Sequence, residues 1–144
     1  MTRTQTVTSP PAGVPVAVAL THSKLLTAAS SGDYERLRPL IPATRFAYSY
    51  GESAGGPIDY WKNVERTTKQ SPIAILASIL KMPYTLNRGI YVWPFAYDKR
   101  KTELSGYDRK LLGPLVTSYV GEDYYGWRAG IKPDGSWIFF AAGD

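Results

Sequence analysis

Cysteine is absent from this sequence of 144 residues, and histidine occurs once, as His22. The lack of cysteine excludes disulfides and thiolate metal sites, and a single histidine disfavours both a zinc centre and a nucleophile–histidine pair. The segment Gly51–Gly56 lacks the glycine spacing and the lysine of phosphate-binding loops. We therefore expect no cofactor and no metal. The chain has twelve carboxylates, so a calcium or magnesium site built from oxygen ligands alone is the alternative that this argument leaves open.

Long hydrophobic runs are also missing. Near the start, Val14–Leu20 gives an apolar run of about seven residues, whereas a membrane-spanning helix needs about 20. Met1–Leu20 offers only Arg3 and an interrupted apolar stretch, which is a poor match to a signal peptide. We expect no membrane span, and the location stays open between the cytoplasm and the mature form of an exported protein.

The composition is that of a globular protein, with 44% hydrophobic and 20% charged residues. This length suits one domain, so we predict a disordered tail over residues 1–13 and a single domain over residues 14–144. The net charge of +5 invites a nucleic-acid interpretation, but the basic residues are scattered, which disfavours it. The one tight run, Lys99–Lys101, fits either a solvated loop or an anion contact.

Apolar spacing and turn residues predict an α+β fold with a small antiparallel sheet of about four strands and four to five helices. Proline and glycine mark most of the boundaries. The expected helices run from Val16 to Ala29 and, as a short helix, from Asp33 to Pro42; two more begin at Pro57 and Ser71, and a last one is capped by Thr102 or Ser105. The expected strands are Arg45–Gly51 and Gly89–Tyr97. Pro94 makes the second of these an edge strand or marks a bulge in it.

A β-hairpin from about Tyr124 to Ala142 is the clearest local feature. Pro133, Asp134 and Gly135 are turn residues between two strand-like runs. The second arm, Trp137–Ala141, is apolar on both faces, which predicts a central or covered strand.

Aromatic residues are abundant, with eleven tyrosines and four tryptophans. If the strands pair, many of these rings share one face of the sheet, which fits either a ligand-binding surface or simply the hydrophobic core. Arg128 stands between two glycines on the other face. Either it contacts an anion there, or the glycines only make room for a neighbouring ring. The candidate ligand-binding residues are Tyr48, Tyr50, Tyr91, Trp93, Tyr97, Tyr125, Trp127 and Arg128.

Acid/base chemistry is the alternative. A carboxylate buried among these rings would have a raised pKa and could transfer protons. His22 fits a catalytic base or an exposed or locally bonded side chain. The candidate carboxylates are Glu52, Asp59, Glu122, Asp123 and Asp144, with Glu122 and Asp123 equally suited to a polar turn.

The run Leu25–Leu40, in which a helix is followed by Ser31-Gly32-Asp33-Tyr34-Glu35 and a second short helix leading into an aromatic strand, resembles the opening of NTF2-like domains. That resemblance implies helices wrapped around a curved antiparallel sheet with a pocket, used for isomerase or hydrolase chemistry or for binding and dimerisation. The helical middle, Pro57–Lys81, departs from the family, and no catalytic Asp/His or Asp/Arg pair transfers. The ending, Tyr125–Asp144, resembles uncharacterised small bacterial proteins, some exported, which implies no activity.

These observations favour a non-catalytic binding or interaction module that uses an aromatic-rich sheet face. A small isomerase- or hydrolase-type enzyme with an NTF2-like pocket is the alternative. The expected partners are a small molecule or a protein, including a second copy of the chain in a homodimer.

Overall fold

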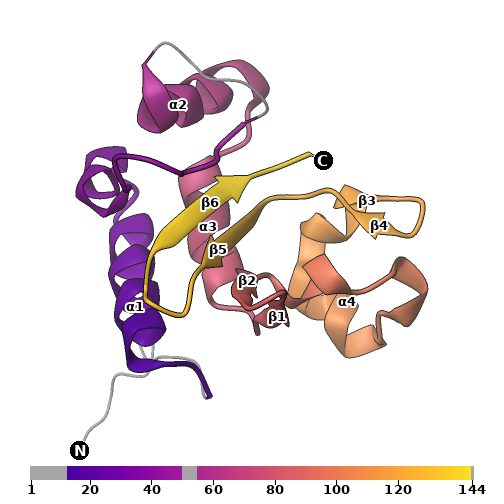
Figure 1. Ribbon diagram of the computed structural model, residues 1–144. Coiled ribbons are helices and arrows are strands. Elements are labelled where there is room, and N and C mark those ends of the chain that lie inside the picture. Colours follow the sequence, from indigo (N-terminus) through magenta and orange to yellow (C-terminus); the bar gives the residue numbers. More distant parts are fainter. Residues whose placement is uncertain (1–12, 50–54, 144) are drawn as a thin grey trace, which may run out of the picture.

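The computed structural model describes residues 13–49 and 55–143, which form a four-stranded antiparallel sheet packed against helices (Figure 1). The predicted α+β class and the C-terminal hairpin are confirmed. The predicted tail, Gly13 excepted, and Tyr50 lie outside the described residues. The strands, in spatial order, are β1 (Thr85–Asn87), β2 (Ile90–Trp93), β5 (Arg128–Ile131) and β6 (Trp137–Ala141).

Four α-helices form within the described residues, close to where capping residues predict them. The Ser71 hydroxyl accepts a bond from the Ala74 N–H, and Pro72 occupies the first turn, so the third helix begins at that point. None of the described helices is both long and apolar enough to cross a membrane. The helices are α1 (Val16–Ser30), α2 (Gly56–Thr68), α3 (Pro72–Leu80) and α4 (Gly106–Leu112), with 3₁₀ helices η2 (Tyr34–Arg36), η3 (Arg38–Leu40), η4 (Phe95–Asp98), η5 (Lys101–Glu103) and η6 (Gly113–Ser118).

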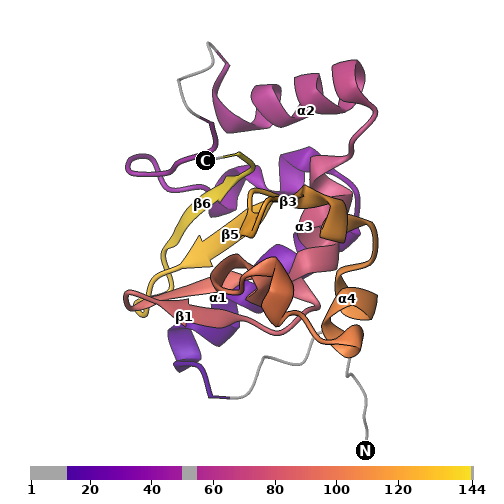
Figure 2. The same ribbon diagram turned by 90° about the vertical axis from the view of Figure 1, so that its right-hand side faces the viewer.

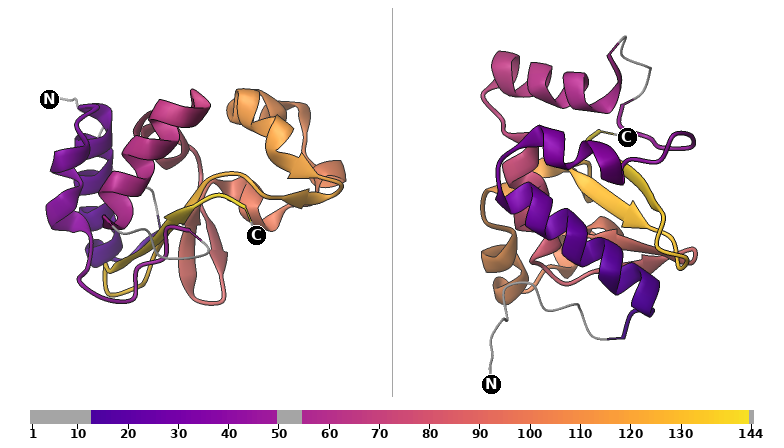
Figure 3. Two further views of the ribbon diagram at one scale, coloured as in Figure 1. Left: turned by 90° about the horizontal axis from the view of Figure 1, so that it is seen from above. Right: turned by 90° about the vertical axis from the view of Figure 1, so that its left-hand side faces the viewer.

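One face of the sheet is covered by α1 and α3 (Figure 3, left). Strand register places Trp93 opposite Ala129 and Ala129 opposite Phe140, and all three are fully buried. Because side chains alternate along a strand, the residues between them face the other side of the sheet.

Aromatic rings fill the space between this covered face and α2. The Trp61 ring centroid lies 5.9 Å from that of Trp137 and 5.3 Å from that of Phe140, and Phe46 packs 4.7 Å from Trp137. Edge-to-face and tilted pairs at these spacings are favourable beyond their buried area. These rings attach α2 to the sheet.

A second hydrophobic cluster lies in the lobe formed by residues 95–124, on the side of the sheet away from α1 (Figures 1 and 2). Phe95, Leu104 and Leu112 belong to it, and the short strands β3 (Tyr119–Val120) and β4 (Asp123–Tyr124) contribute Tyr119 and Tyr124. Leu115 packs against both clusters and so connects the lobe to the main core.

Three predicted details of the sheet are wrong. Instead of a strand over Arg45–Gly51, only Ala47 pairs within the described part, in one parallel bridge to Phe139, and Arg45 at φ +61° lies outside the extended region, so no strand begins at that residue. The second strand is interior rather than an edge and ends at Trp93, because Pro94 lacks an N–H and the chain turns into η4. Finally, β6 is the last strand of the sheet rather than a central one, and the Ala47 bridge pairs with its outer edge.

His22 is a structural residue of the core. Only 3% of it is exposed, its Nε2 lies 2.7 Å from the Leu80 carbonyl oxygen, and its ring packs 5.0 Å from Trp93. This geometry makes Nε2 the donor, while Nδ1 is buried with no hydrogen-bond partner among the described residues. Burial lowers the pKa of His22 below its usual 6.5, although the bond to Leu80 opposes that effect.

The stability of the protein should therefore fall on mild acidification. Unfolded His22 takes up a proton near pH 6.5 and the folded state only at lower pH, so the contribution is intact above pH 6.5 and decreases below it. In urea unfolding between pH 7.5 and 5, the contribution of His22 to the unfolding free energy should decrease by at most about 1.4 kcal/mol per pH unit. In His22→Gln this loss should vanish; an identical pH profile in the variant would contradict the assignment.

Candidate functional site

A groove of about 550 Å³ opens where the uncovered face of the sheet meets the lobe. Its walls come from the β1–β2 turn, η4, the chain just after η4, β4 and the start of β5. The lining residues are Asn87, Arg88, Tyr97, Asp98, Lys99, Arg100, Asp123, Tyr124, Tyr125, Arg128 and Gly143.

Arg128 is the central cation of this groove. Its neighbour Ala129 points into the core, so strand alternation directs Arg128 to the uncovered face, where its guanidinium carbon lies 5.8 Å from the Tyr97 ring centroid. Nη1 donates to the carbonyl oxygens of Gly143 and Gly126. Nε and Nη2 have no hydrogen-bond partner within the described residues, and no described carboxylate forms an ion pair with this side chain.

Burial lowers the pKa of Arg128, with the tyrosines Tyr97 and Tyr124 acting in the opposite sense. A guanidinium stays protonated at neutral pH despite such a shift. The site therefore holds a half-buried positive charge that carbonyl dipoles and one aromatic ring stabilise only in part.

Three further cations surround Arg128. The Lys99 ammonium lies 2.9 Å from Asp108, and the Arg100 Nε lies 4.0 Å from Glu122, so both are partly compensated. Arg88 makes no hydrogen bond or ion pair with any described residue. Because Asp98 and Asp123 are the only carboxylates among the described lining residues, positive charge predominates in the groove.

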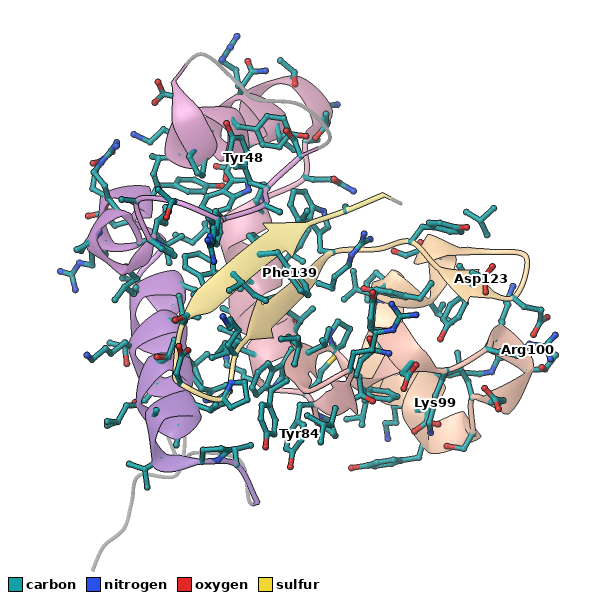
Figure 4. The ribbon with its side chains drawn as sticks, in the orientation of Figure 1. Tyr48, Tyr84, Lys99, Arg100, Asp123 and Phe139 are labelled. Carbon is teal, nitrogen blue, oxygen red and sulfur yellow. The ribbon has the colours of Figure 1, made fainter. Side chains whose placement is uncertain are left out.

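Figure 4 shows the lobe side of the groove and the sheet next to it. Lys99, Arg100 and Asp123, which line the groove, lie on the lobe, and Phe139, which does not line it, lies across from them on the β5–β6 hairpin. The cations thus come from the lobe and the sheet together.

A smaller alcove of about 250 Å³ adjoins the groove, and the two share Tyr97 and Arg128. Register places Ala141 opposite Arg128 and Phe139 opposite Gly130 on the same face, and Ala47 bridges to Phe139. Small and apolar side chains therefore make the floor of the alcove. Its remaining lining residues are Ser49 and Ala142.

The glycines on either side of Arg128 make room for aromatic rings. A Cβ at Gly130 would lie 2.3 Å from the Phe139 ring, and a Cβ at Gly126 would lie 2.6 Å from the Tyr124 ring. The glycines thus have a packing role, while Arg128 between them lines both cavities.

The predicted aromatic set does not form one surface. Tyr97, Tyr125 and Arg128 line the groove, whereas Trp93 and Trp127 are buried in the main core, 0% and 5% exposed. Tyr91 is on the covered face beside Tyr84, and Tyr48 packs 5.6 Å from Tyr60 of α2. Trp127 and Arg128 are neighbours in extended backbone, so their side chains point to opposite faces of the sheet. Tyr97 lies away from Trp93 because the chain turns after Pro94.

Sequence reasoning missed several lining residues. Arg88 belongs to a tight β1–β2 turn whose first strand was not predicted, although Asn87-Arg88-Gly89 before a β-branched run is a usable turn signal. Lys99 and Arg100 belong to the tight basic run for which an anion contact was one interpretation. Of the candidate carboxylates only Asp123 lines the groove; Asp59 is exposed on α2, Glu122 bonds Thr102, and Glu52 and Asp144 lie outside the described residues.

The part of the chain that the structure describes contains no group of three or more histidine, aspartate or glutamate side chains arranged to hold a metal ion.

No family model, curated protein or solved structure matched the chain. The site is therefore interpreted from its own chemistry, and the NTF2-like resemblance stays an expectation.

Tyr124 lines the groove but should act mainly in folding. Its hydroxyl donates to the Trp127 carbonyl oxygen at 2.8 Å, the residue is 6% exposed, and burial raises the pKa of the phenol. Tyr124→Phe should lose about 1–2 kcal/mol of unfolding free energy, because it leaves a buried carbonyl unpaired. Tyr125→Phe, a half-buried groove residue, is the matched control and should change stability by less than about 0.5 kcal/mol in urea unfolding. Equal effects would contradict this division of roles.

Arg88 occupies an unfavourable backbone conformation. It has φ +52° and Gly89 has φ +80°, in a two-residue hairpin turn that asparagine followed by glycine fits best. Arg88→Asn should therefore raise the unfolding free energy by about 0.5–1 kcal/mol. Arg88→Lys keeps both the charge and the strain and should leave stability unchanged; a thermal or urea unfolding series in which Arg88→Asn is destabilised would refute the argument.

Proposed function

We propose that this protein is a binding module that takes a small anionic ligand in the groove between the sheet and the lobe. The observation that carries the proposal is Arg128, whose Nε and Nη2 donors have no partner among the described residues inside a mainly cationic groove. An uncompensated, half-buried charge costs free energy. A bound anion would offset that cost through charge-assisted hydrogen bonds.

Tyr97 and Tyr125 support the same interpretation. The Tyr97 ring holds the guanidinium by a cation–π contact, and both phenols line the space that a ligand would enter. Rings of this kind give contact area at low entropic cost and hydroxyls that orient a ligand. The volume of the groove falls within the range of small-molecule sites.

The acid/base alternative has less support in this groove. A proton-transfer carboxylate at neutral pH needs burial that raises its pKa. Asp98 and Asp123 are exposed, and hydrogen bonds from the Thr102 backbone and hydroxyl lower the pKa of nearby Glu122. Binding rather than proton transfer is thus the function that the groove favours.

The proposal predicts saturable, Arg128-dependent binding of inorganic phosphate. Titration followed by ¹H–¹⁵N NMR should shift the amides of η4, β4 and the start of β5 in wild type. Arg128→Met should weaken binding about tenfold or more, because a charge-assisted hydrogen bond is lost. Arg66→Met, which removes an equal charge from α2, is the matched control and should retain wild-type affinity.

Stability must be measured alongside affinity. Arg128→Met removes a charge that has no ion-pair partner in the described part of the chain, so its unfolding free energy should stay within about 1 kcal/mol of wild type. Absence of saturable shifts, or equal affinities in Arg128→Met and Arg66→Met, would overturn the proposed function.

A further inference from the structure

We infer that the ligand is an amphipathic carboxylate, with its carboxylate on Arg128 in the groove and its apolar body in the alcove. The inference rests on the proposed function and deepens it. Its basis is that one side chain, Arg128, lines a cationic cavity on one side and an apolar cavity on the other.

The donor geometry of Arg128 favours a carboxylate head group. The carbonyls of Gly143 and Gly126 accept from Nη1, which leaves Nε and Nη2 as the two nitrogens without a partner among residues 13–49 and 55–143. Those two N–H groups are parallel along one edge of the planar guanidinium, and this edge matches the two oxygens of a carboxylate. A head group held there lies beside Tyr97, at the boundary of the two cavities.

The alcove beyond Arg128 suits an apolar body. Ala47, Ala141 and Ala142 have no hydrogen-bonding side chain, and the Phe139 ring packs closely against Gly130 beside them. Because one water takes about 30 Å³ in the liquid, the 250 Å³ alcove holds roughly eight heavy atoms. That capacity corresponds to a short alkyl chain or one substituted ring.

Charge and polarity along the two cavities fix the orientation of the ligand. Arg88, Lys99 and Arg100 line the groove and not the alcove, so the negative end has its favourable field only on the groove side. In the opposite orientation an apolar chain would contact these cations and the carboxylate would face Ala47 and Phe139. The amphiphile therefore binds in one direction.

A carboxylate series with increasing chain length tests this inference. Acetate, butyrate, hexanoate and octanoate, titrated by NMR into wild type, should gain about fourfold in affinity per methylene group until the alcove is filled. Octanamide, which keeps the chain without the charge, should bind at least tenfold more weakly than octanoate. Intermolecular NOEs should connect the octanoate chain to the methyl groups of Ala47 and Ala141.

Filling the alcove gives the second arm of the test. Ala141→Leu adds volume opposite Arg128, in the space assigned to the apolar body, and should weaken octanoate about tenfold. Ala74→Leu, at an exposed position of α3, adds the same volume elsewhere and should have no effect on octanoate.

The outcomes separate the two proposals. If no anion binds in an Arg128-dependent manner, the proposed function fails. If phosphate and all four carboxylates bind through Arg128 with equal affinity, the proposed function stands and the amphipathic ligand is excluded. The wild-type series decides this even if Ala141→Leu does not fold.

Discussion

The alternation of side chains along β5 connects the core of this protein to its candidate site. Ala129 and Ile131 are completely buried on the face covered by α1 and α3. A strand with period two must then direct Arg128 and Gly130 to the opposite face. A one-residue change of register would bury a guanidinium and expose apolar side chains, so the core packing itself fixes Arg128 in the groove.

The lobe completes the site that the sheet begins. The chain leaves the sheet at Pro94, forms η4 and returns through β4, and Lys99 and Arg100 are thereby placed across from the uncovered face (Figure 4). Carboxylates outside the groove partly compensate these two cations, whereas Arg88 and Arg128 lack such partners among the described residues. The positive charge available to a ligand is therefore concentrated in the β1–β2 turn and the first residue of β5.

Local patterns in the sequence predict much of the fold. Ser71 and Pro72 define the start of α3, and Pro133, Asp134 and Gly135 define the hairpin, because these residue types restrict the backbone through short-range geometry. The side of the sheet that the helices cover depends on long-range packing, so the sequence leaves open whether Trp93 and Trp127 bind a ligand or fill the core. The structure places both in the core.

The candidate site is predicted less completely, for the same reason. The alternation of side chains along the strand is enough to predict that Arg128 lies on the face opposite to that of Trp127. A continuous strand over Gly89–Tyr97 would place Tyr97 beside Trp93, but the chain turns into η4 after Pro94, and Tyr97 lies against Arg128 instead. Arg88 is separated from Arg128 by forty positions in the chain, and only the pairing of β1 with β2 and of β2 with β5 brings their strands together.

The most direct test of this account is the Arg128 Nε–H signal in a ¹H–¹⁵N NMR spectrum during titration with octanoate. The account predicts that this signal shifts downfield and saturates with the same dissociation constant as the backbone amides of the groove. An Arg128 Nε–H signal that stays in place while those amides shift would contradict it, because the anion would then bind elsewhere than at the guanidinium.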